Sequence, residues 1–402
     1  MTYHESLEWL FSTQKFGIKL GLESVWRLLD VLGNPQVGLR FIHVAGTNGK
    51  GSVCAMTESI LREAGYRTGL FTSPHLVDFC ERIQVGGAKI PEGFVTKGLN
   101  QIHDLSAKWE DTPTFFEIAT ALALLYFAHE KCDIVILETG MGGRLDATNA
   151  VTPLVSVLTP IALDHQRWLG HSLVEIAAEK AGIIKQGIPV VSALQESDVD
   201  QVFVKTTEEK RTAITHVSKA LEGIRIGLTG RHQKFNAALA VAAIRAAGLQ
   251  VTEENIRAGL EKVTWPGRFQ IIKERYILDG GHNPAGVAQL AMTWRECFGD
   301  QKPVVIFGTL KDKDASGMLS NLRDVASRFV LVPVDSDRTV SPEDLKKEKA
   351  LSGMEITVCE SLREALKITA ADKLVLIAGS LFLIGEALAF LQGDAAPRRS
   401  LQ

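Results

Sequence analysis

The residues best suited to chemistry lie in a glycine-rich turn that follows a short apolar run, Phe41 to Ala45. Glycines let the backbone adopt left-handed angles, so consecutive N–H groups can point into one concavity at the start of a helix. A lysine in the turn adds a positive charge where a β- or γ-phosphate would lie. We therefore predict a nucleotide-binding phosphate loop, whose residues are Gly46, Thr47, Asn48, Gly49, Lys50, Gly51 and Ser52.

This loop departs from the general phosphate-loop pattern G-x-x-x-x-G-K-[ST]. Val44 occupies the place of the first glycine, and Gly51 occupies the place of the hydroxyl residue, which comes one position later as Ser52. A lone glycine-rich loop is a weak signal. A tight strand-to-helix turn with a surface lysine is the structural alternative, and it stays open on these residues alone.

Polar side chains also appear where other apolar runs stop. Ser73, Glu138, Asp164 and His165 each follow a predicted strand, so a shared sheet would place them at one edge, near the phosphate loop. Oxygen ligands with one imidazole suit Mg²⁺ better than zinc, which favours histidine and cysteine. Two structural alternatives stay open. Glu138 could brace the glycine-rich turn that follows it, and Asp164 and His165 could form a local hydrogen-bonded pair.

The elements that must position these residues alternate between strands and helices. Apolar runs at residues 134–137, 154–158 and 188–194 indicate buried strands, and helical patterns such as those at 53–64 and 172–184 alternate with them. This alternation predicts an α/β fold with a doubly wound, mostly parallel sheet. The polar, glycine-containing segment from Pro74 to about residue 91 is expected to be a loop that could act as a lid.

A boundary between two domains is predicted near Trp265-Pro266-Gly267-Arg268, because proline and glycine interrupt the pattern there. Residues 1–268 would form the ATP-binding domain. Residues 269–402 would form a smaller, Rossmann-like α/β domain with strands near 277–278, 304–307, 329–332, 356–358 and 374–378. The last ten residues, 393–402, are expected to be disordered.

Composition excludes several classes of function. The 402 residues include 44 Lys and Arg against 47 Asp and Glu, so no excess of positive charge favours binding to nucleic acid or a membrane. Five scattered cysteines without a C-x-x-C spacing argue against a disulfide framework or a thiolate metal site. No targeting or membrane-spanning pattern is found. We expect a cytoplasmic protein, and a monomer.

Several motifs, in order along the chain, resemble those of folylpolyglutamate synthase and dihydrofolate synthase, members of the Mur ligase superfamily. The resemblance covers roughly residues 40 to 390, and its order makes it far more specific than the phosphate loop alone. The motifs are the loop at 46–52, Thr72-Ser73-Pro74-His75-Leu76, the stretch from Glu138 to Asn149, Leu163-Asp164-His165 with Leu169-Gly170, residues 179–183, residues 265–268, Leu278-Asp279-Gly280-Gly281-His282-Asn283-Pro284, and Gly379-Ser380-Leu381.

The resemblance implies a central domain of the Mur ligase type and an ATP-dependent amide ligase. In that family ATP phosphorylates a carboxylate, the amino group of L-glutamate attacks the acyl phosphate, and ADP and phosphate leave. The acceptor would be dihydropteroate, a reduced folate, or both in a bifunctional enzyme. A folylpolyglutamate synthase alone, another Mur-type ligase and a catalytically silent nucleotide-binding homologue are the alternatives.

The resemblance also implies roles for individual residues. Two Mg²⁺ ions are expected, one held by Ser73, Glu138 and His165 and one by Lys180 if that lysine is carbamylated. The expected ATP contacts beyond the loop are Asn236, Arg268 and Asp279, and the expected catalytic residues are Lys50, Lys180 and His282. The alternatives are that Lys180 is an ordinary lysine on a helix surface and that His282 only hydrogen-bonds within its own turn.

Residues for the pterin or folate follow from the same resemblance: Thr114, Leu145, Asp146 and Ala147. A carboxylate such as Asp146 can accept hydrogen bonds from the amino-pyrimidine edge of a pterin. The alternative is that Asp146 caps the turn at Thr148 and Asn149. Gly281 and Gln270 depart from the family pattern, in which alanine and an acidic residue are usual.

Overall fold

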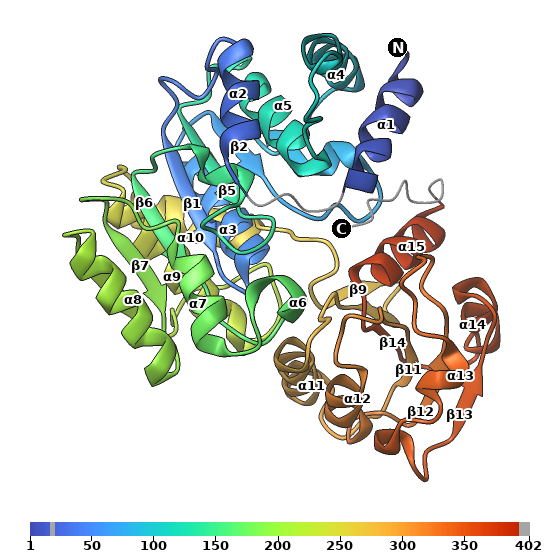
Figure 1. Cartoon of the computed structure of the whole chain (residues 1–402). Coiled ribbons are helices and arrows are strands. Elements are labelled where there is room, and N and C mark those ends of the chain that lie inside the picture. Colours follow the sequence, from blue (N-terminus) through green and yellow to red (C-terminus); the bar gives the residue numbers. More distant parts are fainter. Residues whose placement is uncertain (17–20, 394–402) are drawn as a thin grey trace.

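A computed structural model describes residues 1–16 and 21–393, and it contains two α/β units, each built on its own sheet (Figure 1). All but the first residue of the tail expected to be disordered lie outside these ranges. The larger unit contains helices α1 to α10 and strands β1 to β8, and the smaller unit contains strands β9 to β14 and helices α11 to α15. This arrangement confirms the α/β fold class.

The larger sheet has eight strands in the order β4-β3-β2-β5-β1-β6-β7-β8. Strands β2, β5, β1, β6, β7 and β8 run parallel to one another. The central strand β1 lies between β5 and β6, and Val44 pairs with Glu138, so the phosphate loop begins beside that carboxylate. The strands are β1 (Phe41–Ala45), β2 (Thr68–Phe71), β3 (Ile83–Val85), β4 (Ala88–Lys89), β5 (Ile134–Glu138), β6 (Val155–Leu158), β7 (Val190–Ala193) and β8 (Ile214–Val217).

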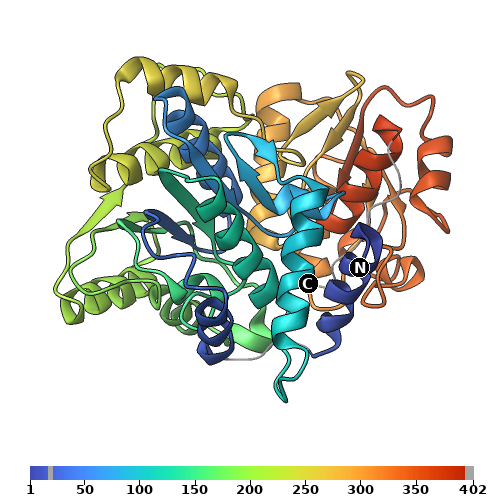
Figure 2. The same cartoon turned by 90° about the horizontal axis from the view of Figure 1, so that it is seen from above.

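Helices cover both faces of this sheet, because its central strands are apolar on both sides. Phe41, Val135 and Leu137 belong to a core that also includes α1, α2, α4 and α5, whereas their neighbours Ile42 and Ile136 belong to a core with α3, α9 and α10. Figure 2 shows helices on both sides of the sheet. The helices are α1 (Tyr3–Ser12), α2 (Glu23–Val31), α3 (Lys50–Glu63), α4 (Glu92–Ser106), α5 (Phe115–His129), α6 (Gln166–Leu169), α7 (Leu173–Ala181), α8 (Ser197–Glu209), α9 (Arg231–Ala246) and α10 (Glu253–Lys262).

The second half of the segment expected to be a lid, residues 83–89, forms part of the sheet instead. Strands β3 and β4 extend it beyond β2 by antiparallel pairing. Gly86 and Gly87 make the turn between them with positive φ angles of 57° and 81°, which glycine adopts readily. The polar composition of the segment reflects its position at the edge of the sheet.

The smaller sheet has six strands in the order β13-β12-β11-β14-β10-β9, and only the β9–β10 pair is antiparallel. Its strands are β9 (Gln270–Ile272), β10 (Tyr276–Leu278), β11 (Val304–Phe307), β12 (Arg328–Leu331), β13 (Ile356–Val358) and β14 (Val375–Ala378). Its helices are α11 (Pro284–Phe298), α12 (Ala315–Arg323), α13 (Pro342–Leu345), α14 (Leu362–Ile368) and α15 (Leu381–Gln392). No helix in the described ranges is long and apolar enough to cross a membrane.

The two units touch through the loop that follows β2. Leu76 and Val77 pack against an apolar cluster of the smaller unit that includes Leu383 and Ile384 of α15. Gly385 lets this loop approach closely, because a Cβ atom at that position would lie 2.0 Å from the carbonyl oxygen of Leu76. The loop at the carboxyl end of β2 therefore contacts the smaller unit directly.

Candidate active site

The phosphate loop is built by close packing around its glycines. Gly46 and Gly49 have φ angles of 147° and 91°. A Cβ atom at Gly46 would lie 1.9 Å from Thr159 Oγ1, and one at Gly49 would lie 2.7 Å from Asn236 Oδ1. Lys50 begins α3, and its Nζ donates hydrogen bonds to the carbonyl oxygens of Gly46 (3.1 Å) and Thr47 (3.3 Å). The lysine is therefore held over the loop, whereas Ser52 is buried within the first turn of α3.

Gly51, which departs from the usual pattern, is explained by a neighbour from the interdomain linker. A Cβ atom at Gly51 would lie 2.8 Å from Nε1 of Trp265. Gly51 lies within α3 and its φ is not positive, so the requirement is for space rather than for an unusual backbone angle. The indole ring excludes a serine or threonine side chain here.

Glu138 ends β5 and is buried, and its Oε2 accepts a hydrogen bond from the N–H of Ser73 over 3.0 Å. Burial raises the pKa of Glu138, whereas the charge of Lys50, the Ser73 N–H and the charge of Arg268 act in the opposite direction. The glycine-rich turn after β5 is held by Asp146, which accepts hydrogen bonds from the N–H groups of Gly140 and Met141. Glu138 accepts its hydrogen bond from Ser73 instead. The carboxylate of Glu138 is thus influenced by a lysine of the larger unit and an arginine of the linker.

Lys180 is not a surface lysine. It is 4% exposed, and its Nζ donates a hydrogen bond to the carbonyl oxygen of Gly46 over 2.8 Å. Burial, followed by the charge of Lys50, lowers the pKa of Lys180 to about 7. A large share of such an amine is neutral near neutral pH, which is the form that reacts with CO₂.

Asp164 joins the two units. Its Oδ1 accepts from the N–H of His165 (2.8 Å) and from Nζ of Lys313 (2.5 Å). Its Oδ2 lies 3.3 Å from Nε2 of His282 and 3.3 Å from Nδ2 of Asn283. Burial would raise the pKa of Asp164, but the hydrogen bond and charge of His282 and the charge of Lys313 hold it well below its usual range.

His165 and His282 lie on either side of this carboxylate. His165 adopts a left-handed conformation (φ 50°) immediately before α6, and burial together with the charge of Lys313 lowers its pKa to about 3. A neutral imidazole of this kind can ligate a metal. His282 Nδ1 lies 2.8 Å from the carbonyl oxygen of Gly280, so His282 hydrogen-bonds within its own turn and also contacts the larger unit.

A cavity of about 450 Å³ opens beside the loop, between the two units. Asn48, Gly49, the ends of β6 and β7, α9 and α11 line it. Asn236 lies here, and its Nδ2 donates to Oε1 of Gln233 over 2.9 Å. His232 also lines the cavity, and its Nδ1 is buried without a hydrogen-bond partner. Such a space, with polar atoms near a phosphate loop, suits the nucleoside part of a nucleotide.

Asp279, which follows β10, lies close to the linker residues Arg268 and Phe269. The carboxylate of Asp279 accepts from the N–H groups of Phe269 (2.9 Å) and Gly281 (2.8 Å), so it fixes the backbone of the linker and of the His282 turn. Nη1 of Arg268 donates to the carbonyl oxygen of Gly267 over 3.2 Å. A Cβ atom at Gly280 would lie 2.4 Å from the same Nη1, so glycine there leaves room for the guanidinium group.

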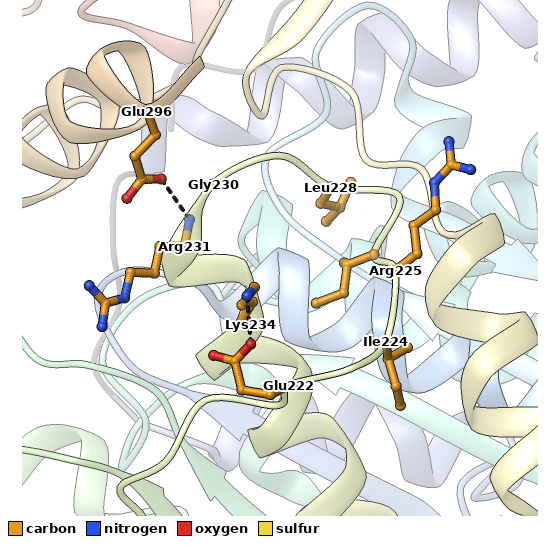
Figure 3. A pocket seen from close by; sticks show the side chains of 9 residues that line it. Glu222, Ile224, Arg225, Leu228, Gly230, Arg231, Lys234 and Glu296 are labelled. Carbon is orange, nitrogen blue, oxygen red and sulfur yellow. Dashed lines mark hydrogen bonds and ion pairs between the residues drawn. The ribbon is translucent and has the colours of Figure 1, made fainter. Parts of the chain in front are cut away.

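A second cavity, of about 610 Å³, adjoins the first and shares Arg231 and Glu296 with it (Figure 3). Lys234 Nζ donates to Glu222 over 2.7 Å, the backbone N–H of Arg231 donates to Glu296 over 3.3 Å, and Nη1 of Arg225 lies 3.5 Å from Glu261. None of the residues predicted from the sequence lines it.

None of the residues predicted to bind the pterin lines the cavity beside the phosphate loop. Thr114 caps α5, where its Oγ1 accepts from the N–H of Glu117 and donates to the Glu117 carboxylate. Asp146 accepts from the N–H groups of Gly140 and Met141 and from both the N–H and the hydroxyl of Thr148. Asp146 therefore caps its own turn. Ala147 is buried, whereas Leu145 is half-buried.

Lys313 is the residue of this site that sequence reasoning missed. It lies 149 positions from Asp164 along the chain and belongs to no motif considered above. The only signal in the sequence is a cluster of alternating charges, Lys311-Asp312-Lys313-Asp314, after a predicted strand.

Two families of known domains and several characterised proteins are similar to this chain in sequence. The Mur ligase middle domain family matches residues 44–193, and the family described as Mur ligase, glutamate ligase domain matches residues 267–381. The dihydrofolate synthase/folylpolyglutamate synthase of Bacillus subtilis is 38% identical over 96% of this chain and 98% of its own length. The protein of the same name from Escherichia coli is 34% identical over 95% of this chain and 94% of its own.

Solved structures resemble the whole chain as well. FolC of E. coli in complex with DHPP and ADP has a TM-score of 0.88 with 33% identity, covering 96% of this chain and 98% of that one. Folylpolyglutamate synthase of Mycobacterium tuberculosis complexed with ADP has a TM-score of 0.89 with 29% identity, covering 98% and 100%.

Proposed function

Since the chain belongs to the dihydrofolate synthase/folylpolyglutamate synthase family, whose members are ATP-dependent ligases, we propose that it joins L-glutamate to dihydropteroate, to reduced folates or to both. The observation that carries the proposal is the convergence of cations on the phosphate loop. Lys50 and Lys180 both hydrogen-bond to Gly46, and Arg268 of the linker acts on the neighbouring Glu138.

This arrangement suits phosphoryl transfer followed by amide formation. An acceptor carboxylate attacks the γ-phosphate of ATP, ADP leaves, and the amino group of L-glutamate then displaces phosphate from the acyl phosphate. Lys50, the N–H groups of the loop and Arg268 would neutralise charge that develops on the phosphate oxygens. The position of the site between two units would keep water from the acyl phosphate.

The residues present suit two Mg²⁺ ions. The proposed ligands of the first are Ser73, Glu138 and the imidazole of His165, and those of the second include a carbamylated Lys180. No group of three or more His, Cys, Asp or Glu residues that could hold a metal occurs in the described ranges. A site with few protein ligands fits Mg²⁺, which retains waters and binds phosphate oxygens. When bound, the ions would supply further neutralisation of phosphate charge.

The remaining roles are proposals of the same kind. Asn236 and Asp279 would contact the nucleoside, and His282 would act near the phosphates or the incoming amine. The pterin would be contacted by Thr114, Leu145, Asp146 and Ala147. A catalytically silent homologue is disfavoured because its expected losses are absent: Lys50, Glu138, His165, Lys180, Arg268 and Asp279 are all present. A monomeric state, a cytoplasmic location and the absence of nucleic-acid partners stay predictions.

The test is an ADP-release assay with L-glutamate and either dihydropteroate or tetrahydrofolate as the acceptor. Release that requires both glutamate and an acceptor supports the proposal, and the comparison of acceptors identifies the substrate. Lys50→Ala should lower turnover by about a hundredfold or more, because it removes a charge that stabilises the transition state. Lys262→Ala, which removes an exposed lysine paired with Glu63, is the matched control. Glutamate-independent release, or normal turnover of Lys50→Ala, would contradict it.

A further inference from the structure

Asp164 depends on the smaller unit for most of its hydrogen bonds. Among the described residues four donors face this carboxylate, and three of them, on Lys313, His282 and Asn283, belong to the smaller unit. The side chain of Asp164 is 5% exposed and that of Lys313 is 8% exposed. If the units separated, the carboxylate would keep only the groups of His165 among these partners, namely its backbone N–H and its imidazole, whose Nε2 lies 4.0 Å away.

Lys313 is presented by a fixed segment rather than by a free surface loop. The segment follows β11, and Leu310 forms a β-bridge with Thr339. The N–H of Lys311 donates to the carbonyl oxygen of Arg338 over 2.8 Å, and the N–H of Lys313 donates to that of Leu310 over 3.1 Å. The position of the Lys313 ammonium group is therefore set by the sheet of the smaller unit.

Asn283 extends the same contact to the phosphate loop. Its amide and that of Asn48 exchange two hydrogen bonds, of 3.0 and 3.2 Å. Oδ1 of Asn283 also accepts from the N–H of Gly286 and so caps α11. One side chain thus connects the loop, Asp164 and the start of a helix in the smaller unit.

From these contacts we propose that Asp164 and Lys313 form an interdomain latch that holds the smaller unit in register with the phosphate loop. Lys313 is a positioning residue: it acts through Asp164, which in turn orients His282 and Asn283. A buried, hydrogen-bonded ion pair suits this role. A docked arrangement that separated Asp164 from Lys313 would leave each charge buried without its partner, so the arrangement that pairs them is favoured. The role in catalysis rests on the proposed ligase function, but the docking itself does not.

The direct test is the distance between the units in the protein without substrates. Cys297 on α11 is the exposed cysteine, so a spin label there can be paired with one at Ser197→Cys, an exposed position that begins α8. Pulsed electron spin resonance then gives the distance distribution. We expect Lys313→Met and Asp164→Asn to broaden it toward longer distances, and Lys313→Arg to retain the distribution of the unmutated chain.

Kinetics supply the second readout. Loss of the latch should lower kcat/KM by about tenfold for ATP, acceptor and glutamate alike, since all three are aligned by the docked arrangement. The double variant should lose little more than either single variant, because both remove the same contact. Lys347→Met, which removes an exposed pair with Asp344 inside the smaller unit, should change neither readout.

Two outcomes would overturn the proposal. One is an unchanged distance distribution in both Lys313→Met and Asp164→Asn. The other is an unchanged distribution with a higher KM for glutamate alone in Lys313→Met, which would make Lys313 a substrate contact. The distance measurement needs no substrate, so it tests the docking alone. The ligase proposal is tested separately by the ADP-release assay on the unmutated chain, and failure of one can be told from failure of the other.

Discussion

Nζ of Lys180 donates a hydrogen bond to the carbonyl oxygen of Gly46 over 2.8 Å, so a buried lysine of α7 contacts the first glycine of the phosphate loop. A second lysine, Lys50, binds the same carbonyl oxygen. Two ammonium groups on one acceptor repel each other, and conversion of Lys180 to a carbamate would replace that repulsion by attraction.

We therefore predict that Lys180→Ala lowers ADP release strongly and that short carboxylic acids partly restore it, because they can occupy the place of the carbamate. Titration of acetate or formate into the assay measures the rescue. Lys50→Ala is the control and should show none. A ¹³C spectrum of the active enzyme in labelled bicarbonate without a carbamate signal would contradict the modification.

Gly385→Ala should separate the two units. The added Cβ would lie 2.0 Å from the carbonyl oxygen of Leu76, which belongs to the backbone and cannot simply rotate away. We expect a larger radius of gyration in small-angle scattering and about tenfold lower turnover, with unchanged secondary structure in circular dichroism. Gly93→Ala in α4 has no atom within 4 Å of the new Cβ and is the matched control. An unchanged radius would show that α15 accommodates the methyl group.

His43 should make the protein sensitive to acid. It is fully buried on β1, Nε2 lies 2.8 Å from the hydroxyl of Thr148, and Nδ1 has no partner. Burial lowers the pKa of His43 from 6.5 to about 3. Between these values the unfolded chain binds a proton that the folded chain does not, so the free energy of unfolding falls as the pH decreases.

His43→Gln should remove that part of the pH dependence. The contribution at pH 5 is about 2 kcal/mol relative to pH 7. Urea unfolding at both pH values measures it, and the variant should lose less stability on acidification than the unmutated chain. His4→Gln, at an exposed site, is the control. Equal losses in His43→Gln and the unmutated chain would show that the histidine is protonated in the fold.

Substitutions of Leu145 and Asp146 should differ in their effects on acceptor binding and on thermal stability. Asp146 makes four hydrogen bonds within its turn, so Asp146→Ala should lower the melting temperature as well as activity. Leu145 is half-buried, so Leu145→Ala should raise the KM of the pterin acceptor with little change in melting temperature. The two variants are compared by thermal unfolding and by acceptor titration. An unchanged acceptor KM in Leu145→Ala would argue against contact with the pterin.

The fold was predictable where one physical signal dominates. β1 and β5 are buried on both faces, and helices alternate with the strands along the chain as a parallel sheet requires. The parallel part of the larger sheet could therefore be predicted. β8 was not predicted, because its residues are partly exposed at the edge of the sheet. β3 and β4 were missed for a similar reason: short, polar strands gain their structure from pairing with β2 rather than from their own sequence.

The site was predictable through motifs and not through long-range contacts. The phosphate loop and Glu138 carry local signals, and the structure places them side by side. The partnership of Asp164 with Lys313 has no local signal, because it depends on how two separately folded units meet. The turn-capping role of Asp146 was foreseen as an alternative, and its hydrogen bonds show that role directly.

The contact between Gly51 and Trp265 has a consequence for how this loop could change over time. A substitution of Gly51 by serine would restore the common phosphate-loop pattern, yet the new side chain would collide with an indole ring that anchors the linker. The usual hydroxyl residue would therefore require the Trp265 side chain to move. We expect the residue at position 51 and the residue at position 265 to constrain each other.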